Sequence, residues 1–525
     1  VRGMPAVHYV GQMIRGLLCY VLDNNPGVEK RCLDGFGSEL DDAGPTPDDL
    51  RVGREALANL LGVACTEPAK STENDVDSPL LADIIEAWRV EAGDPDDQPT
   101  RWLIEGAPAG LSRDIEPRGI FPLLEEHEVG EGINGDVSDL VVPPDEVTNY
   151  PGIEDDEDVV SEIQGLIEAK VVRSFDSYED LCDSIGSKPV ISKVGCVKKT
   201  LPGGKVKKRI VLDCKRSQVA PKTKRQERCV LPRIRDPVHS LLEMMALFYG
   251  VEGMIFEWAV LDVSAAFYIL GLHKQERRFF VFMFKGKFYV YVRMVMGAGG
   301  SPLCWGRLVS LIARLTAGVF DENEFRMEVF VDDPIVTVCG DRKRVDRNLA
   351  LWVYLWRILG VPLAFKKGQR GANVVWVGAS LSCSQQGVTA TIRNEIKDRV
   401  ELQVAEDSQP FGLLCESRGF AASHTEAFWQ HLWASLQATS SGAPVQCIWR
   451  KQIDFTIDWL ACFLAGVSGS LTRTFDLMAY MNWGVPISLL LDASPWGLGA
   501  ALREGDKLSA GSHPSWTTLM SRGTV

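Results

Sequence analysis

The chain has 525 residues, 46% hydrophobic and 24% charged, which is enough apolar material for more than one core. Its formal net charge of −14, from 70 acidic and 56 basic residues, argues on average against a general nucleic-acid binder. No run of about 18 uncharged apolar residues occurs, so we predict no membrane-spanning helix. No signal peptide follows Val1. We expect a fragment of a longer intracellular product, located in the cytoplasm or nucleus, with its 13 scattered cysteines reduced.

The first third of the chain is strongly acidic. From Glu39 to Glu162, Pro, Gly and Asp recur, a composition typical of loops and disorder. Short helical patches are predicted within it, for example over Leu80–Val90. We therefore predict an acidic, partly disordered N-terminal extension over residues 1–159, acting as a spacer rather than as a dedicated binding tail.

The sign of the charge then reverses. Between Lys188 and Arg235 there are sixteen Lys or Arg residues and only two acidic ones, so this stretch carries a local charge of about +14. Such a stretch is often only a solvated face. Here apolar runs over Pro189–Val197 and Arg209–Leu212 interrupt it, which predicts strands and a folded basic surface.

The middle of the chain mixes hairpins and helices. Phe279–Phe284 and Phe288–Val295 predict a hairpin through Lys285-Gly286-Lys287, and Met327–Val331 and Ile335–Val338 predict another through Asp332-Asp333-Pro334. Ser301-Pro302 predicts the N-cap and first residue of a helix. A second helix follows from an apolar stripe formed by Leu349, Trp352, Trp356 and Leu359. This order predicts an α+β fold with helices on one side of a sheet. Residues 394–466 are expected to be mostly helical.

Three carboxylates stand out by position. Asp262 ends the apolar run Ala259–Leu261, and Asp332 and Asp333 lie at the tip of the second predicted hairpin. If both strands belong to one sheet, the carboxylates can meet, and hard oxygen ligands suit Mg²⁺. Two such ions can activate a hydroxyl and stabilise a leaving phosphate. The alternative is that Asp332-Asp333-Pro334 is an ordinary turn.

The order of six segments resembles the polymerase motifs of reverse transcriptases, over about residues 160–380. They are Lys207–Asp213, Val260–Phe267, Gly297–Pro302, Phe330–Asp333, Leu359–Val361 with Lys366-Lys367, and Val375–Gly378. The resemblance implies a right-hand polymerase with fingers and palm over 160–380 and a helical thumb or connection over 381–485. It implies an RNA-directed DNA polymerase that takes deoxynucleoside triphosphates and an RNA or DNA template with primer.

The resemblance also implies roles for individual residues. Asp262 and Asp332 would hold two Mg²⁺ ions, or Mn²⁺ in their place, with Asp333 supporting the site. The other implied roles are triphosphate neutralisation by Arg209 and Lys199, sugar selection by Phe267, close backbone approach at Gly297, proton donation by Lys366 or Lys367, and primer positioning by Trp376 and Gly378. Phe267 and Trp376 have a plain alternative as core aromatics, and the two lysines as a solvated helix end.

The chain departs from the family pattern at three positions. Val295 and Met296 precede Gly297 where Pro and then Gln or Phe are usual, and Met cannot donate the hydrogen bonds of Gln. Pro334 removes one backbone donor after the Asp pair. None of these changes removes a predicted metal ligand.

The end of the chain adds one more resemblance. Ile487–Ser494, followed by Trp496–Ala501, is similar to the first hairpin of a ribonuclease H domain, with Asp492 as a metal ligand. We predict an incomplete, inactive ribonuclease-H-like start over 486–525, and a retrotransposon polyprotein of the long-terminal-repeat or DIRS-like kind. The alternative function is a decayed element that binds nucleic acid without polymerising. The oligomeric state, the priming mechanism and the host stay open.

Overall fold

The computed structural model describes residues 5–40, 43–64, 67–68, 77–133, 140–200, 206–393, 472–485, 487–494, 497–504 and 507–512. Two compact units are formed. The first contains residues 1–237 and 253–378, and the second contains residues 238–252 and 379–525. Among the described residues, no helix combines the length and apolar character needed to cross a membrane.

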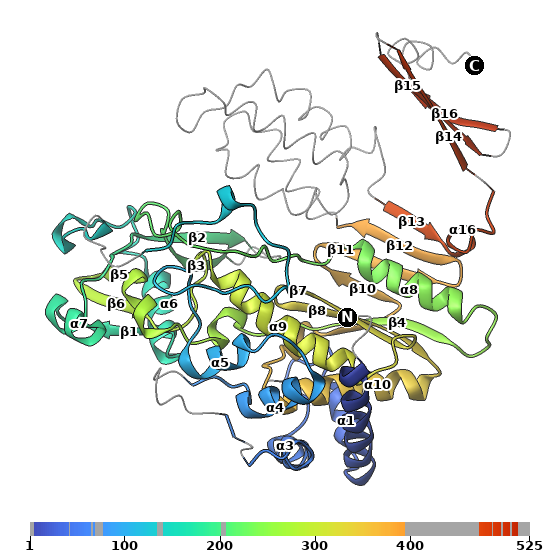
Figure 1. Cartoon of the computed structure of the whole chain (residues 1–525), viewed down its shortest axis with the longest axis horizontal. Coiled ribbons are helices and arrows are strands. Elements are labelled where there is room, and N and C mark those ends of the chain that lie inside the picture. The colour runs from blue at the N-terminus through green and yellow to red at the C-terminus, as the bar shows by residue number, and fades with distance from the viewer. Residues whose placement is uncertain are drawn as a thin grey trace. The chain divides into compact units, whose positions relative to one another are not determined.

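The first unit contains a four-stranded antiparallel sheet in the order β7-β8-β4-β9 (Figure 1). Its strands are β4 (Ile255–Val260), β7 (Phe325–Phe330), β8 (Asp333–Gly340) and β9 (Gln369–Gly371). Helices α9 (Ser301–Ala317) and α10 (Arg342–Ile358) pack on this sheet, and β10 (Asn373–Trp376) follows β9 in the chain. The predicted mixture of helices and strands is confirmed here. The predicted apolar stripe of Leu349, Trp352, Trp356 and Leu359 is also confirmed, since all four side chains are buried.

Two local predictions need correction. The second hairpin forms, but its turn is Val331-Asp332, because Phe330 already pairs with Asp333 and Pro334 pairs with Val329. Ser301 is not an N-cap, since α9 begins at Ser301 and Gly300 caps it without a side-chain bond. The Ser301 hydroxyl instead donates to the carbonyl of Val295 at 2.8 Å, which ties the helix to the loop before it.

A second, three-stranded sheet has the order β1-β6-β5. It consists of β1 (Val172–Phe175), β5 (Val281–Phe284) and β6 (Lys287–Tyr291), with helices α6 (Glu157–Glu168) and α7 (Tyr178–Ile185) beside it. The predicted hairpin is confirmed, since β5 and β6 pair antiparallel, but its turn is Lys285-Gly286 and not Lys285-Gly286-Lys287, because Lys287 already pairs with Phe284. The basic segment forms two strands as predicted, although their bounds differ from the predicted runs Pro189–Val197 and Arg209–Leu212. They are β2 (Val194–Thr200) and β3 (Val206–Leu212), which make a separate antiparallel pair.

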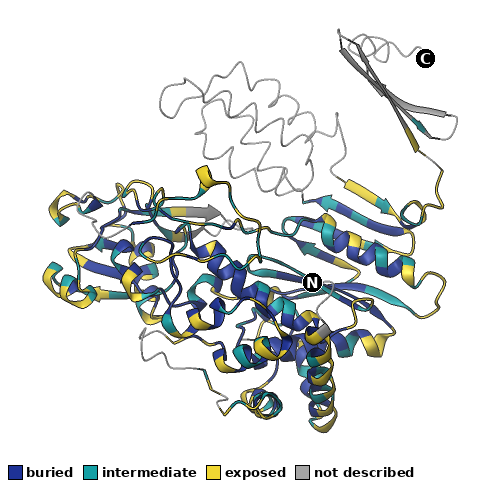
Figure 2. Ribbon diagram, viewed as in Figure 1, coloured by how far each residue is buried: buried dark blue, intermediate teal, exposed yellow. Residues whose placement is uncertain are grey.

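The described residues of the N-terminal third contain several α-helices where only short helical patches are predicted, while the partial disorder of this extension stays a prediction. Its helices are α1 (Pro5–Asn24), α2 (Val28–Asp34), α3 (Pro47–Leu61), α4 (Ala82–Ala92) and α5 (Gln98–Glu105). Buried residues of these helices, such as Ile14, Leu57 and Trp88, share one apolar core with α9 and α10 (Figure 2). Local signals help to define them, for example the capping box between Thr46 and Asp49 at the start of α3. The short 3₁₀ helices η1 (Glu126–Glu128) and η3 (Pro144–Glu146) follow.

The second unit contains most of α8 (Arg235–Leu247) and the strands β11 (Ala379–Ser384), β12 (Gly387–Ile392) and β13 (Thr472–Asp476), with the short helix α16 (Leu477–Tyr480). The prediction of helices over 394–466 lies outside the described residues. Strands β14 (Ile487–Ser494), β15 (Gly497–Glu504) and β16 (Lys507–Ser512) form an antiparallel sheet. The predicted terminal hairpin is therefore confirmed as a hairpin, with Asp492 opposite Gly499 in its register.

Candidate active site

Asp262 and the Asp332-Asp333 pair meet at one end of the β4–β8 ladder. Val260 pairs with Ile335 at the last rung of the two strands. The ladder continues beyond it, because the Leu261 N–H donates to the Pro334 carbonyl at 3.2 Å and the Val263 N–H donates to the Asp332 carbonyl at 2.7 Å. Asp262 thereby stands opposite Asp333, although the two lie 71 positions apart in the chain. Pro334 keeps its carbonyl in this ladder, so its missing N–H does not separate the strands.

Electrostatic effects between the three carboxyl groups are strong. Burial raises the pKa of Asp332, and the charge of Asp262 raises it further, while Lys367 and Arg209 act in the opposite direction. Burial raises the pKa of Asp333 to about 7, with added contributions from the charges of Asp332 and Asp262 and from a hydrogen bond to Asp262. Such crowding of acids disfavours full ionisation and favours the binding of a cation.

Lys367 provides a positive charge at the same point. The segment after α10 runs beside the Asp262 loop, with the Ala364 N–H donating to the Asp262 carbonyl at 2.8 Å and the Ser264 N–H donating to the Pro362 carbonyl at 2.8 Å. This segment ends in the 3₁₀ helix η6 (Phe365–Lys367). The Lys367 ammonium lies 2.5 Å from a carboxylate oxygen of Asp262. Lys366, the other predicted proton donor, pairs with Glu39 instead.

Three successive carbonyls around Asp332 each accept a hydrogen bond from a different segment. The Trp305 indole N–H donates to the Val331 carbonyl at 2.7 Å, and the Trp376 indole N–H donates to the Asp333 carbonyl at 3.0 Å. Between them, the Asp332 carbonyl accepts from Val263. Trp376 is 1% exposed and also stacks edge-on against Phe330. This geometry favours a structural role for the Trp376 side chain over contact with a primer. Gly378, two residues later, has a φ of 81°, which favours glycine.

Trp305 is the residue that sequence reasoning missed. It lies four residues after Ser301 and in line with Leu308 and Ile312, so periodicity places it on the buried face of α9. A buried indole usually needs an acceptor for its N–H, and that requirement was the available signal. The sequence alone does not reveal that the acceptor is the carbonyl of Val331.

The residues predicted to bind the nucleotide lie in several nearby elements. Arg209 is exposed on β3 opposite Val197, close enough for its charge to lower the pKa of Asp332. The backbone of Lys199 belongs to β2 and pairs with Lys207, while its side chain lies outside the described residues. Phe267, on the 3₁₀ helix η4 (Ala266–Ile269), is half-buried and packs against the main core.

Gly297 borders a hollow of about 600 Å³ together with the end of β3. Its φ of 92° favours glycine, and an added Cβ would meet nothing closer than the Leu212 carbonyl at 4.0 Å. The side of this glycine is therefore open, which agrees with close approach of a ligand to the backbone. Asp213 lies in the same hollow and accepts a hydrogen bond from the Tyr150 hydroxyl at 2.5 Å.

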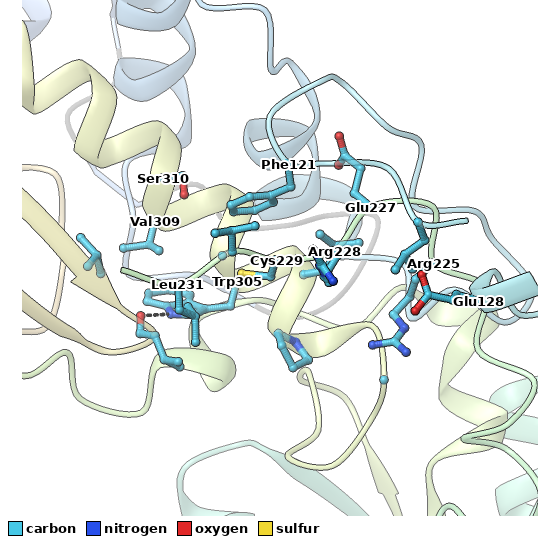
Figure 3. Close-up of a pocket in the computed structure, with 18 residues that line it drawn as sticks. Phe121, Glu128, Arg225, Glu227, Arg228, Cys229, Leu231, Trp305, Val309 and Ser310 are labelled. Atoms are coloured by element: carbon cyan, nitrogen blue, oxygen red, sulfur yellow. Dashed lines mark hydrogen bonds between the residues drawn. The ribbon is translucent and has the colours of Figure 1, made fainter. Parts of the chain in front are cut away.

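A second hollow, of about 400 Å³, lies beside Trp305 (Figure 3). Phe121, Cys229 and Val309 contribute apolar side chains to it, and Val329 and Val331 border it from the hairpin. Burial raises the pKa of Cys229 to about 11, so its thiol stays protonated at neutral pH. This hollow thus lies between α9, which carries Trp305, and the β7–β8 hairpin, whose turn carries Asp332.

The donor set fits a divalent cation in its chemistry. Asp262, Asp332 and Asp333 supply only carboxylate oxygens, and the raised pKa of Asp333 reflects negative charge that a cation would neutralise. In the part of the chain that the structure describes, no three His, Cys, Asp or Glu side chains already converge as a metal site. At Asp262 the ammonium of Lys367 takes the position of a counter-charge, so a cation would compete with Lys367 there.

No family model and no curated protein matches the chain. Similar solved structures include those of the foamy viral protease-reverse transcriptase with an RNA/DNA hybrid (17% identity, TM-score 0.41, covering 74% of this chain and 47% of that one). Two others, with double-stranded DNA, have 16% and 18% identity and a TM-score of 0.40, covering 80% and 77% of this chain and 65% and 78% of theirs. The chain thus spans less than two thirds of the first two. At these values the likeness carries no conclusion about the activity or partners of this chain.

Proposed function

We propose that the chain is an RNA-directed DNA polymerase, which adds deoxynucleotides to a primer 3′-hydroxyl on an RNA or DNA template. The observation that supports this most is the meeting of Asp262 with Asp332 and Asp333 at one end of the β4–β8 ladder. These residues come from two of the six segments that resemble polymerase motifs. An ordinary turn would not need a third acid from another strand beside it.

In this proposal each residue has a definite task. Asp262 and Asp332 hold two Mg²⁺ ions, with Asp333 as a supporting carboxylate. Bound there, the ions supply activation of the attacking hydroxyl and neutralisation of the leaving phosphate. Arg209 and the basic β2–β3 hairpin neutralise the triphosphate, and Lys367 donates a proton to the pyrophosphate. Residues 160–380 form the fingers and palm and 381–485 the thumb.

Primer extension on an RNA template with Mg²⁺ tests this function directly. We expect wild-type extension with deoxynucleotides and a loss of at least about 1,000-fold in Asp332→Asn. Asp346→Asn is the matched control. Asp346 is an acid on α10 that pairs with Arg342 of the same helix and with Arg370 of β9, and it has no part in the proposed reaction. Extension that survives Asp332→Asn would defeat the mechanism.

A decayed element that binds nucleic acid is the competing function. It predicts no extension by the wild type together with salt-sensitive binding of template and primer. An RNA polymerase predicts equal use of ribonucleotides. Phe267 opposes that reading, since a bulky side chain under the sugar would clash with a ribose 2′-hydroxyl. We expect Phe267→Ala to raise ribonucleotide use at least tenfold relative to deoxynucleotide use.

A further inference from the structure

We propose that Trp305 is a positioning residue that holds Asp332 in place through the carbonyl of Val331. This inference rests on the proposed function of the carboxylates but concerns a different part of the molecule. Trp305 belongs to α9 and touches none of the three acids in the interactions described above. Its effect would pass through one backbone hydrogen bond.

The backbone at Val331 is strained without such a bond. Val331 has a φ of 57°, in the left-handed region that β-branched residues rarely adopt. A non-glycine residue there persists only where surrounding contacts impose it. The indole N–H of Trp305, 2.7 Å from the Val331 carbonyl, is such a contact, and Figure 3 shows it as a dashed line.

The bond to the Val331 carbonyl differs from the other two bonds in the element that supplies its donor. The Asp332 and Asp333 carbonyls are held by Val263 and Trp376, both on segments that follow the strands of the same sheet. Trp305 alone of these three donors belongs to α9. The N-terminal end of α9 begins directly after Gly297–Gly300, the segment predicted to lie against the nucleotide. The bond therefore links α9, which follows that segment, to the turn that carries Asp332.

The ring of Trp305 also lines a hollow between α9 and the β7–β8 hairpin. It is 2% exposed and borders the 400 Å³ hollow together with Val329 and Val331 (Figure 3). Removal of the whole side chain would therefore disturb packing as well as the hydrogen bond. Trp305→Phe is the informative change, because it keeps an aromatic ring while it removes the N–H donor, and its loss of ring volume is matched by the same substitution at another buried tryptophan.

The first measurement separates turnover from binding. In Trp305→Phe we expect kcat for extension to fall about tenfold, as for one lost hydrogen bond, while KM for the deoxynucleotide stays within about twofold. The Mg²⁺ concentration for half-maximal extension should rise. Trp352→Phe is the matched control, since Trp352 is a fully buried indole whose N–H has no hydrogen-bond partner among the described residues. It should leave all three values within about twofold.

A second variant tests the route through Val331. Glycine adopts a φ of 57° without strain, so Trp305→Phe should cost about tenfold in the wild-type background but no more than about twofold in Val331→Gly. Glycine keeps the carbonyl that accepts the bond, so the coupling in this double-mutant cycle reports the backbone strain that the bond counters. Equal costs in both backgrounds would overturn the proposal.

Hydrogen exchange keeps the inference separate from the proposed function. Amide exchange of a peptide spanning 327–338 should be faster in Trp305→Phe than in the wild type, and unchanged in Trp352→Phe. This readout needs no polymerase activity. If the wild type does not extend primers but the exchange differs as expected, the proposed function fails while the positioning role stands. Unchanged exchange and unchanged kcat in Trp305→Phe would refute the positioning role.

Discussion

Asp262 and Asp333 stand opposite each other where the β4–β8 ladder ends. The pKa of Asp333 is raised to about 7, so its carboxyl group carries a proton in a large part of the molecules at neutral pH. Burial and two neighbouring acids hold this proton near neutral pH. A bound cation would remove the need for it.

Asp333→Asn should therefore stabilise the metal-free protein. The amide keeps the size of the side chain but cannot ionise, so we expect the melting temperature in EDTA at pH 8 to rise by a few degrees. The same change should reduce the further rise that Mg²⁺ produces, because one ligand is lost. Differential scanning calorimetry with and without Mg²⁺ measures both effects.

The control for this prediction is Asp346→Asn. Asp346 accepts from Arg370 at 2.6 Å and lies 2.9 Å from Arg342, so its loss should lower the melting temperature and leave the Mg²⁺ effect unchanged. A lower melting temperature in Asp333→Asn as well would show that the three acids do not repel one another as described.

Lys367→Gln should affect catalysis more than stability. The Lys367 side chain is 65% exposed, and exposed ion pairs contribute at most about 1 kcal/mol to the free energy of unfolding. As the proposed proton donor it should be worth about 100-fold in kcat. Loss of its charge should also lower the Mg²⁺ concentration needed for half-maximal extension. Lys366→Gln, next to it and paired with Glu39, should change neither value. Equal effects of the two substitutions would contradict the role given to Lys367.

The candidate site could be predicted from sequence because its signals are local. Each acid follows a short β-branched or aromatic run, and the two runs are long enough to be strands of one sheet. The predicted turn, Asp332-Asp333-Pro334, begins one residue later than the observed turn, Val331-Asp332. Asp333 and Pro334 are poor strand residues by propensity, yet pairing with Phe330 and Val329 draws both into β8.

The N-terminal third could not be predicted in the same way, because its partners are distant in the chain. Asp94 and Asp96 look like loop acids in their own sequence context, but they pair with Arg314 and Arg307 on α9, more than 200 positions away. From composition alone, these acids are predicted to be solvated. Only the tertiary structure shows that they pair with arginines of α9, and that the apolar residues of the neighbouring helices pack into the same core as α9.

The stability of the protein should depend on pH through His273. Burial, together with the charges of Arg113, Arg277 and Lys274, lowers the pKa of His273 to about 4. As the pH falls from about 6.5 to about 4, the unfolded chain therefore gains a proton at this residue before the folded chain does, and stability is lost in that interval. His273→Asn keeps an acceptor for the Gln275 N–H and does not titrate. Its melting temperature should fall less between pH 7 and pH 4.5 than that of the wild type. Parallel curves for the two proteins would contradict this account.

Asp96→Asn should be among the most destabilising single changes in the described residues. Arg307 is fully buried, and two of its guanidinium nitrogens donate to the Asp96 carboxylate, while a third donates to Gln98 at 2.8 Å and to the Glu116 carbonyl at 2.6 Å. Asp96→Asn leaves the buried Arg307 charge with only the more distant carboxylate of Glu227, 3.9 Å away, and breaking a buried ion pair in this way costs about 3–5 kcal/mol.

Asp48→Asn is the matched control for Asp96→Asn, since Asp48 is 93% exposed and lies 3.8 Å from Arg51. Its loss should change the free energy of unfolding by no more than about 0.5 kcal/mol. Urea unfolding followed by tryptophan fluorescence measures both variants. If Asp96→Asn and Asp48→Asn unfold at the same urea concentration, the acidic segment is not anchored to α9 by Asp96. Since α9 also carries Trp305, a large effect of Asp96→Asn would mean that the N-terminal segment supports the helix that positions Asp332.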